Sequence, residues 1–550
     1  MAQKEDENYD IIIVGAGVAG LYSAYQFIQY GFDPKRILVL ERLNRVGGLL
    51  KSDLVDIGGY VIKQEEGGMR FMSKTLTEKI IKEVGLGDQI VDFQMASDAN
   101  LNNVRGCRFT NKQARENLVW YDIFNTELTK KEIEANPLPD ILLNSVFQRI
   151  VDLNGHKSPT TPQEWQYARL NWDILGKKLY EWDFGFLLRK MGLTYESIRM
   201  IQQTIGFKSV FNRNINAGVG FQLTLDFSSD PKFYTLLYGY NQLPISLCKI
   251  ITEKGAKVKL LCEVQILRED DTNKIYPIKI QYCDSNSSKP FNRTIRCNRC
   301  ILALPKIALQ SLAEKNDWMN QAANFSSYVD SVISLSLTKI DIYFESQWWD
   351  QLGFSDGPSF TDLNLGSVYI FNSIRDPKVR KGTSDQPGSL TIYCDYQSSF
   401  YWHSMQSIGE DFIPKDNVKA PEDSVLAKKI VVEAIMDELT QLFQMPNYSP
   451  DKQGSNKILC TKNPITPPDP VLATYTHWTE PRFGDSPHAW KVSSDDGKIS
   501  PGVYNLLGKN IAIIGETYSL QQGWVEGALL HTDDYFARYV DLKKSDASKK

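Results

Sequence analysis

Three glycines near the amino terminus have a spacing that lets backbone approach a dinucleotide. Gly15, Gly17 and Gly20 follow an apolar, β-branched run at residues 10–14, and Glu41 lies further along the chain. In this pattern the first glycine permits a tight turn, the second admits a pyrophosphate, and the third lets a helix pack on the strand. The helix amino terminus then faces the phosphates, and the acidic side chain accepts hydrogen bonds from ribose hydroxyls. These residues predict a dinucleotide-binding βαβ unit.

The acidic residue leads directly into a second glycine pair. Gly47 and Gly48 follow Glu41 in the segment 42–48. Because glycine has no Cβ, this pair can bring further backbone close to a cofactor. The extension favours FAD over NAD as the dinucleotide.

The composition is that of a large enzyme with no bias towards a polyanionic partner. The chain has 550 residues, 42% of them hydrophobic, and its 62 basic and 66 acidic residues give a formal net charge of -4. This length exceeds what one hydrophobic core usually organises. The charge balance predicts no binding to nucleic acid or to an anionic membrane, and no segment has the ~20 consecutive apolar residues that span a bilayer. A homo-oligomer is compatible with this composition.

The eight cysteines are scattered and do not form a disulfide scaffold. Cys297 and Cys300 have the spacing of half a zinc site, but no second pair or histidine cluster supplies the other ligands. We therefore expect no metal and interpret this pair as part of a strand. The segment 1–8 is polar and acidic, unlike a secretory signal. These features predict a cytoplasmic protein.

Apolar periodicity predicts the elements around these motifs. Helices are predicted at residues 21–30, 240–253 and 523–539. Strands are predicted at residues 36–41, 257–267, 300–304, 331–344 and 511–514. Between residues 161 and 207 apolar side chains recur at helical spacing, as in Trp172, Leu175, Leu179 and Trp182.

The order of these elements predicts an α/β protein with a discontinuous Rossmann-like domain. The FAD-binding domain is expected at residues 1–66, 236–320 and 500–550. A substrate-binding domain with a mixed sheet is expected at residues 67–115 and 321–499. Residues 116–235 are expected to form a helical insertion.

Several segments resemble the flavin amine oxidase superfamily. Residues 41–48 resemble its E-x-x-x-R-x-G-G segment, with Glu41, Arg45, Gly47 and Gly48 at the fixed positions. Further matches follow in order along most of the chain, at residues 67–70, 239–244, 300–305, 388–393, 515–516 and 523–528. The resemblance is closest to L-amino-acid oxidases, and it implies an amine oxidase-like fold.

The resemblance assigns roles to four residues as catalytic candidates. Arg70 is implied to bind a substrate carboxylate, and a planar guanidinium suits two parallel hydrogen bonds to that group. Lys339 matches the lysine that holds a water near the flavin, and Tyr393 matches a tyrosine that donates to the carboxylate, with Tyr396 as a competitor. Trp524 is implied to meet substrate and flavin. The plainer alternatives are a surface arginine, a solvent-facing lysine, a core tyrosine and a helix cap.

Candidate cofactor-binding residues follow from the glycine motif and from the resemblance together. They are Gly15, Ala16, Gly17, Val18, Ala19, Gly20, Glu41, Arg42, Arg45, Gly48, Leu49, Gly67, Gly68, Met69, Arg70, Val264, Glu516, Gly523, Trp524 and Val525. Leu49 stands where many relatives carry arginine, and His531 replaces a small residue of the last helix. No cysteine occupies residues 485–488, where monoamine oxidases carry their flavin-linking cysteine, so we expect noncovalent FAD.

The resemblance implies an oxidase that uses O2 to convert an L-amino acid to a 2-oxo acid, ammonia and hydrogen peroxide. Three alternatives stay open. An amino-acid 2-monooxygenase shares the arginine but yields an amide. A polyamine or monoamine oxidase does not need Arg70, and a structural flavoprotein would bind FAD without catalysis.

Overall fold

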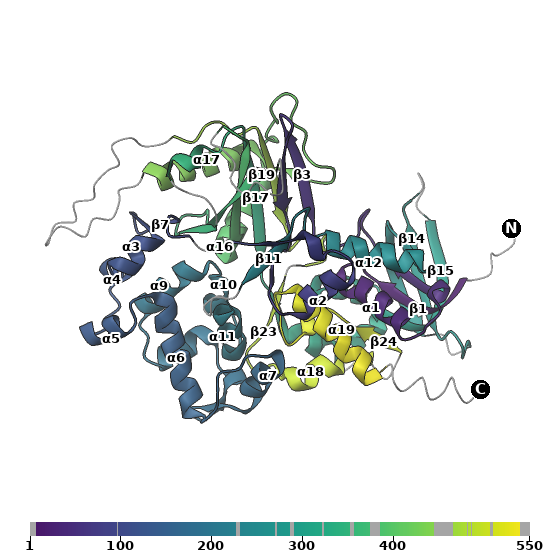
Figure 1. The fold of residues 1–550 in the computed structure, drawn as a ribbon. Coiled ribbons are helices and arrows are strands. Elements are labelled where there is room, and N and C mark those ends of the chain that lie inside the picture. Colours follow the sequence, from purple (N-terminus) through teal and green to yellow (C-terminus); the bar gives the residue numbers. More distant parts are fainter. Residues whose placement is uncertain are drawn as a thin grey trace.

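The computed structural model describes residues 7–95, 97–226, 232–269, 272–286, 291–321, 324–352, 357–374, 385–444, 466–480, 482–485, 487–506 and 510–539. Residues 1–6 and 540–550, which include most of the polar chain ends, lie outside this part, as does Cys460. Figure 1 shows one sheet with its helices at the right, a second sheet at the top and a group of helices at the lower left.

A seven-stranded sheet contains the predicted βαβ unit. Its order is β12-β2-β1-β15-β14-β13, with β24 beside β15. The strands are β1 (Glu7–Val14), β2 (Ile37–Leu40), β12 (Lys257–Lys259), β13 (Cys262–Glu269), β14 (Ile278–Asp284), β15 (Phe291–Leu302) and β24 (Ile511–Ile513). Because β1 is parallel to β2 and β15, and β15 is parallel to β24, the carboxyl ends of these strands meet at one edge.

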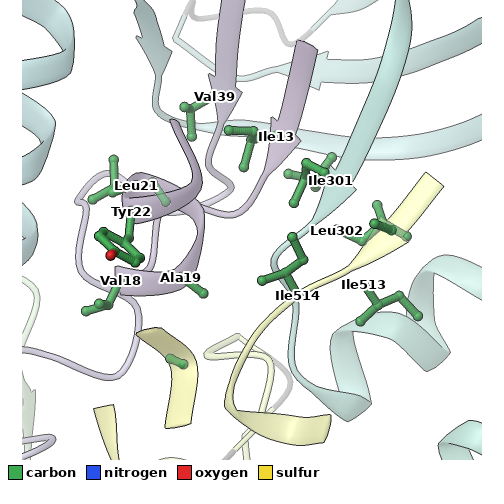
Figure 2. Packing of buried hydrophobic residues seen from close by; sticks show 14 of the residues in the cluster. Ile13, Val18, Ala19, Leu21, Tyr22, Val39, Ile301, Leu302, Ile513 and Ile514 are labelled. Carbon is green, nitrogen blue, oxygen red and sulfur yellow. The ribbon is translucent and has the colours of Figure 1, made fainter. Parts of the chain in front are cut away.

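Continuous apolar runs explain why these strands lie inside the molecule. Ile11, Ile12 and Ile13 are all buried, as expected for a parallel strand covered on both faces. Figure 2 shows Ile13 and Val39 of neighbouring strands packed near Leu21 of the first helix, with Ile301 and Ile513 beyond. The helices of this part are α1 (Val18–Gln29), α2 (Leu76–Glu83), α12 (Gln242–Glu253), α13 (Lys306–Glu314), α14 (Asp317–Gln321), α15 (Phe325–Asp330), α18 (Asp496–Gly502) and α19 (Val525–Tyr539).

The single strand predicted at residues 257–267 is wrong. The chain forms β12, which is parallel to β2, and then β13, which is antiparallel to β14. Leu261 between them has a φ of 53°. The break occurs because the chain wraps around the end of β2, where Glu41 N donates to Lys259 O and Cys262 N donates to Glu41 O.

A second, mixed sheet lies beside the first. Its main path is β21-β22-β17-β20-β19-β18-β7-β8, and a hairpin of β3 and β4 joins it at β19. The strands are β3 (Ser52–Ile57), β4 (Tyr60–Glu65), β7 (Leu101–Val104), β8 (Cys107–Thr110), β17 (Leu337–Phe344), β18 (Pro358–Thr361), β19 (Ser367–Ile374), β20 (Gly388–Asp395), β21 (Val425–Leu426) and β22 (Leu472–His477). Two helices pack against it, α16 (Tyr396–Gln406) and α17 (Lys429–Gln444).

The strand predicted at residues 331–344 is two strands. β16 (Val332–Ser334) pairs with β23 (His488–Trp490) in a separate ribbon, and only β17 enters the mixed sheet. Every residue of β17 is buried, so both faces of the strand are covered. A three-stranded sheet, β5-β11-β6, also lies outside the two large sheets and consists of β5 (Phe71–Met72), β6 (Ile90–Asp92) and β11 (Phe233–Leu236).

Residues 111–225 are mostly helical. The helices are α3 (Asn111–Glu116), α4 (Val119–Ile123), α5 (Lys130–Ala135), α6 (Pro139–Leu153), α7 (Pro162–Asn171), α8 (Phe184–Lys190), α9 (Tyr195–Ile205), α10 (Ser209–Asn212) and α11 (Ala217–Leu225). Residues 172–182 are an exception to the predicted helical spacing. They form a hairpin of β9 (Asp173–Ile174) and β10 (Lys177–Lys178), followed by a 3-10 turn. Leu175 is 67% exposed at the tip of this hairpin, where Gly176 permits the turn.

The helices and the two sheets each have a hydrophobic core of their own. The division into the three predicted domains stays our proposal.

One buried ion pair connects the helices to the carboxyl-terminal part of the chain. Arg169 of α7 contacts Asp496 of α18 through Nε at 2.9 Å and Nη2 at 2.6 Å, and Nη1 donates to Gln222 Oε1 of α11 at 2.7 Å.

We predict that Arg169→Met destabilises the protein strongly. Neither side chain of the pair has more than 1% exposure, so the change would leave the Asp496 carboxylate buried without its cation. Such a loss costs about 3–5 kcal/mol. Urea denaturation should show it. Lys130→Met, which removes only an exposed pair with Glu134, should leave the urea midpoint in place, and adding Asp496→Leu to Arg169→Met should recover stability.

Candidate functional site

The first glycine turn is shaped by backbone contacts that leave no room for side chains. A Cβ on Gly15 would lie 2.5 Å from Ala303 O, and one on Gly20 would lie 2.0 Å from Gly15 O. Gly17 differs, because a Cβ there would meet only Gly48 Cα, at 3.8 Å. Gly17 therefore presents its backbone to open space, as a close approach of a pyrophosphate requires.

This space is a cavity of about 360 Å3, within the range of small-molecule and cofactor sites. It is lined by the nucleotide sheet, the mixed sheet and the helices. The predicted site residues that line it are Gly15, Gly17, Val18, Ala19, Glu41, Arg42, Gly48, Leu49, Gly67, Gly68, Met69, Arg70, Val264, Tyr393, Glu516, Gly523, Trp524 and Val525.

Four predicted residues, Ala16, Gly20, Arg45 and Lys339, do not line the cavity. Two of them, Ala16 and Arg45, support its wall from behind. Ala16 N donates to Glu41 Oε2 at 2.7 Å, which fixes the acidic side chain at the end of β2. Arg45 Nη2 donates to Gly48 O at 2.9 Å and so holds the second glycine turn.

Arg70 lies in the cavity wall and is 7% exposed. Its guanidinium carbon is 5.4 Å from the ring centre of Phe93, 5.5 Å from that of Phe233 and 5.9 Å from that of Tyr369. Aromatic faces at these distances attract a cation and restrict its orientation. The arrangement provides a held, largely desolvated positive charge at the cavity, suited to an anionic ligand group.

Tyr393 and Lys339 are opposite each other on β20 and β17. The Lys339 ammonium is 5.0 Å from the Tyr393 ring centre and donates to Glu65 O at 2.7 Å and to Gly67 O. Burial lowers the pKa of Lys339 to about 7, because its charged form is poorly solvated there. Lys339 thus fixes the backbone of the turn that leads to Arg70.

Tyr393 is half-buried, and desolvation raises the pKa of its hydroxyl, which therefore stays a donor at neutral pH. Its ring contacts Phe207 of the helical part at 5.8 Å and Tyr369 at 6.1 Å. Tyr396, the competing candidate, begins α16 and does not line the cavity.

Trp524 joins the carboxyl-terminal segment to the helical part. Its Nε1 donates to Asp226 Oδ2 at 3.1 Å, and its ring stacks on Phe233 at 6.0 Å. Burial raises the pKa of Asp226 to about 7. The indole face at the cavity is therefore set by one hydrogen bond and by the aromatic residue that also contacts Arg70.

Glu516 lies where β24 ends and contacts His488. Glu516 Oε2 is 2.8 Å from His488 Nδ1, and His488 Nε2 is 3.0 Å from Asp485 Oδ2. On the other side of Gly515, the buried His531 accepts from Gly515 N through Nδ1 at 3.2 Å. Burial lowers the pKa of His531 to about 4, which keeps that nitrogen an acceptor and gives this departure from the family pattern a structural role.

Sequence reasoning missed the residues that surround the recognised ones. These are Phe93, Phe233, Tyr369, Asp226 and Asp485. Their partners are distant in sequence, and no local pattern marks them. His488 also lines the cavity, whereas the nearby Trp490 does not, and its Nε1 donates to Ser519 O.

The seven cysteines in the described ranges are free thiols. Within those ranges no group of three or more His, Cys, Asp or Glu side chains is placed to hold a metal ion. No helix in the described part of the chain has both the length and the apolar character needed to cross a membrane.

Known proteins resemble this chain over nearly its whole length. The family model described as "Flavin containing amine oxidoreductase" matches residues 18–530. Aplysianin-A of Aplysia kurodai is 24% identical over 562 residues, which cover 96% of this chain and 91% of that protein. L-amino acid oxidase Lm29 of Lachesis muta is 23% identical over 376 residues, which cover 66% of this chain and 63% of that protein. These matches confirm the resemblance noted in the sequence.

A solved structure confirms the predicted fold. Cyclohexylamine oxidase from Brevibacterium oxydans has a TM-score of 0.60 with this chain at 13% identity, covering 97% of this chain and 99% of that one. At this identity the likeness shows the α/β amine oxidase fold.

We predict that Lys339 makes the free energy of unfolding depend on pH. The folded protein holds the ammonium proton with a pKa of about 7, and the unfolded chain holds it with an ordinary pKa of 10.5. Between these values the unfolded chain binds more protons, so this difference makes stability rise with pH. Urea midpoints of the wild type and Lys339→Met are measured from pH 6 to pH 11. The midpoint of the wild type should rise relative to that of the variant between about pH 7 and about pH 10.5. Parallel curves would contradict the assignment.

Proposed function

The chain belongs to the flavin-containing amine oxidoreductases, and from that premise we propose that it is an FAD-dependent oxidase that deaminates an L-amino acid. The products are a 2-oxo acid, ammonia and hydrogen peroxide. The observation that carries the amino-acid proposal is the Arg70 guanidinium, held in the cavity wall by Phe93, Phe233 and Tyr369.

The residues of the cavity fit FAD bound without a covalent link. Gly17 offers unobstructed backbone for the pyrophosphate, and Glu41 lies at the strand end where a ribose hydroxyl is accepted. Leu49 supplies no charge where many relatives carry arginine. Among the cationic residues that line the cavity, Arg42 is the nearest to Leu49 in sequence. When bound, the flavin supplies a two-electron acceptor for the carbon that bears the amine, and O2 reoxidises it.

The substrate is held by groups of this chain in a defined orientation. Arg70 binds the carboxylate through charge-assisted hydrogen bonds, and the Tyr393 hydroxyl donates a further one. Trp524 and Phe207 bound the space beside them. Holding the carboxylate with two groups and enclosing the rest of the substrate in this way contributes by orientation rather than by acid-base chemistry. Lys339 keeps the Gly67 carbonyl, and with it this wall, in place.

The alternatives differ in what they require of the site. A polyamine or monoamine oxidase gains nothing from a desolvated Arg70, although the fold is shared with cyclohexylamine oxidase. An amino-acid 2-monooxygenase uses the same clamp and differs in its product. A structural flavoprotein needs no oriented Trp524.

The free cysteines also favour a reducing, cytoplasmic location, which we propose with the function.

We predict that Arg70→Met lowers kcat/KM for L-amino acids by about 100-fold, the loss expected when a charged hydrogen-bonded pair is removed. Peroxide release in air is measured for each L-amino acid and for the amine that lacks its carboxylate. Turnover of the amines should barely change in the variant.

Arg149→Met is the control, because Arg149 lies on α6 with its guanidinium on Met191 O. It should behave as wild type. An amide product would identify a monooxygenase, and wild-type preference for the amines would identify an amine oxidase without a carboxylate clamp. A yellow protein that turns over none of these compounds would favour the structural role.

We predict that acid precipitation releases all of the yellow cofactor into the supernatant, because the bound FAD has no covalent link. Absorbance and mass of the released compound identify it as FAD. A yellow pellet would contradict the prediction.

A further inference from the structure

His488 lies where four parts of the structure meet. It begins β23, and Ser334 of β16 is its register partner. Its Nδ1 contacts Glu516 of the last nucleotide segment, and its Nε2 contacts Asp485. The side chain is 1% exposed, and the residue lines the cavity.

Both ring nitrogens face carboxylate oxygens, at 2.8 Å and 3.0 Å. A neutral imidazole has one N–H and could donate to only one of them, so the geometry requires the imidazolium. Burial lowers the pKa of His488, but Glu516 and Asp485 outweigh it and raise the pKa to about 9. Lys306 N, 3.4 Å from Nε2, is then a close neighbour and not a donor to that nitrogen.

Among the residues that the structure describes, the same contacts leave Glu516 one acceptor position. An ionised carboxylate has about four. Oε1 accepts from His488 N at 3.0 Å and from Gly523 N at 2.6 Å, and Oε2 accepts from His488 Nδ1 at 2.8 Å. Because Glu516 lines the cavity, the remaining position on Oε2 is available to a ligand donor there.

Asp485 gives an independent sign that this arrangement is enforced. Its φ of 153° is a backbone conformation that residues other than glycine rarely adopt. It is kept there by Ser334 Oγ, which donates to Asp485 Oδ2 at 2.6 Å, and by Ile307 N at 3.3 Å. Strain of this kind persists where the surroundings over-determine it, and it concentrates at functional sites.

We propose that His488 is a positioning residue of the cofactor site: held between Asp485 and Glu516, it orients the Glu516 carboxylate to accept from a hydroxyl of the bound FAD. This inference rests on the proposed cofactor and not on the proposed substrate. It also explains how the buried Asp485 carboxylate and the partly buried Glu516 carboxylate coexist at one wall of the site, because the imidazolium between them offsets one negative charge.

The test is a double-mutant cycle on FAD affinity. Apoprotein of the wild type, His488→Gln, Glu516→Gln and the double variant is titrated with FAD by flavin fluorescence. Each single change should raise Kd about 10-fold, the size expected for a hydrogen bond to a charged group. Because His488 acts through Glu516, the double variant should also show about 10-fold and not about 100-fold.

His403→Gln is the matched control. His403 stacks on His477 at 4.2 Å and does not line the cavity, so its FAD affinity should equal that of the wild type. Additive effects in the cycle, or an unchanged Kd in His488→Gln, would overturn the proposal.

A pH titration of the wild type needs no variant to fold. The His488 pKa is about 9, above its ordinary value of 6.5, so the charge-assisted contact to Glu516 is complete at neutral pH and loses its charge as pH rises through about 9. FAD Kd should therefore rise about 10-fold between pH 7 and pH 10, and a flat profile would overturn the proposal. Other charged groups in this region are Lys306, Arg213, Lys491 and Asp330, so the same titration of Glu516→Gln, expected to be flat, isolates the His488 contribution.

The outcomes separate the two proposals. A wild type that binds no FAD overturns both the proposed function and this inference. A wild type that binds FAD with the predicted cycle but oxidises no amino acid supports the role of His488 and removes only the proposed substrate.

Discussion

The contact between two glycine turns determines where everything else in the site can lie. Gly48 approaches so closely that a Cβ there would be 3.1 Å from Gly17 Cα, and Gly17 and Gly47 form an isolated parallel bridge. A side chain on Gly48 would crowd Gly17, so the end of β1 and the turn after β2 together form one backbone surface. This surface lines the cavity together with Arg70, Tyr393 and Trp524.

The segment that leads to Arg70 is built at a cost in buried charge. Lys51 and Glu66 are 2.8 Å apart, and Lys63 and Glu65 are 3.2 Å apart, with all four side chains at 10% exposure or less. Lys63 and Glu65 belong to β4, Glu66 follows it and Lys51 precedes β3, so the pairs lie just before the Gly67 carbonyl that Lys339 holds. Buried pairs of this kind are weak contributors to stability but costly to break. Their effect here is to make the conformation of the turn before Arg70 unique.

The sequence predicted what is encoded locally. The glycine spacing, the acidic residue at the end of β2 and the helix after the turn are all contained in one short segment, and the structure has them in place. The breaks at Leu261 and between β16 and β17 were missed because each is caused by a partner strand far away in sequence. Phe93 and Asp226 were missed for the same reason: their contacts with Arg70 and Trp524 exist only after three separate segments have packed together.

The arrangement of the nucleotide sheet has a consequence for how the chain matures. β24 pairs with β15, and the segment after it supplies Glu516 and Trp524, close to the carboxyl terminus. During synthesis, the glycine turns leave the ribosome long before these residues do, although domains generally fold from the amino terminus first. A nascent chain therefore displays an open half of the cofactor cavity until Glu516 and Trp524 have been synthesised. Assembly of the holoenzyme must be a late event, and a prematurely terminated chain would expose this unfinished surface to the chaperones of the cell.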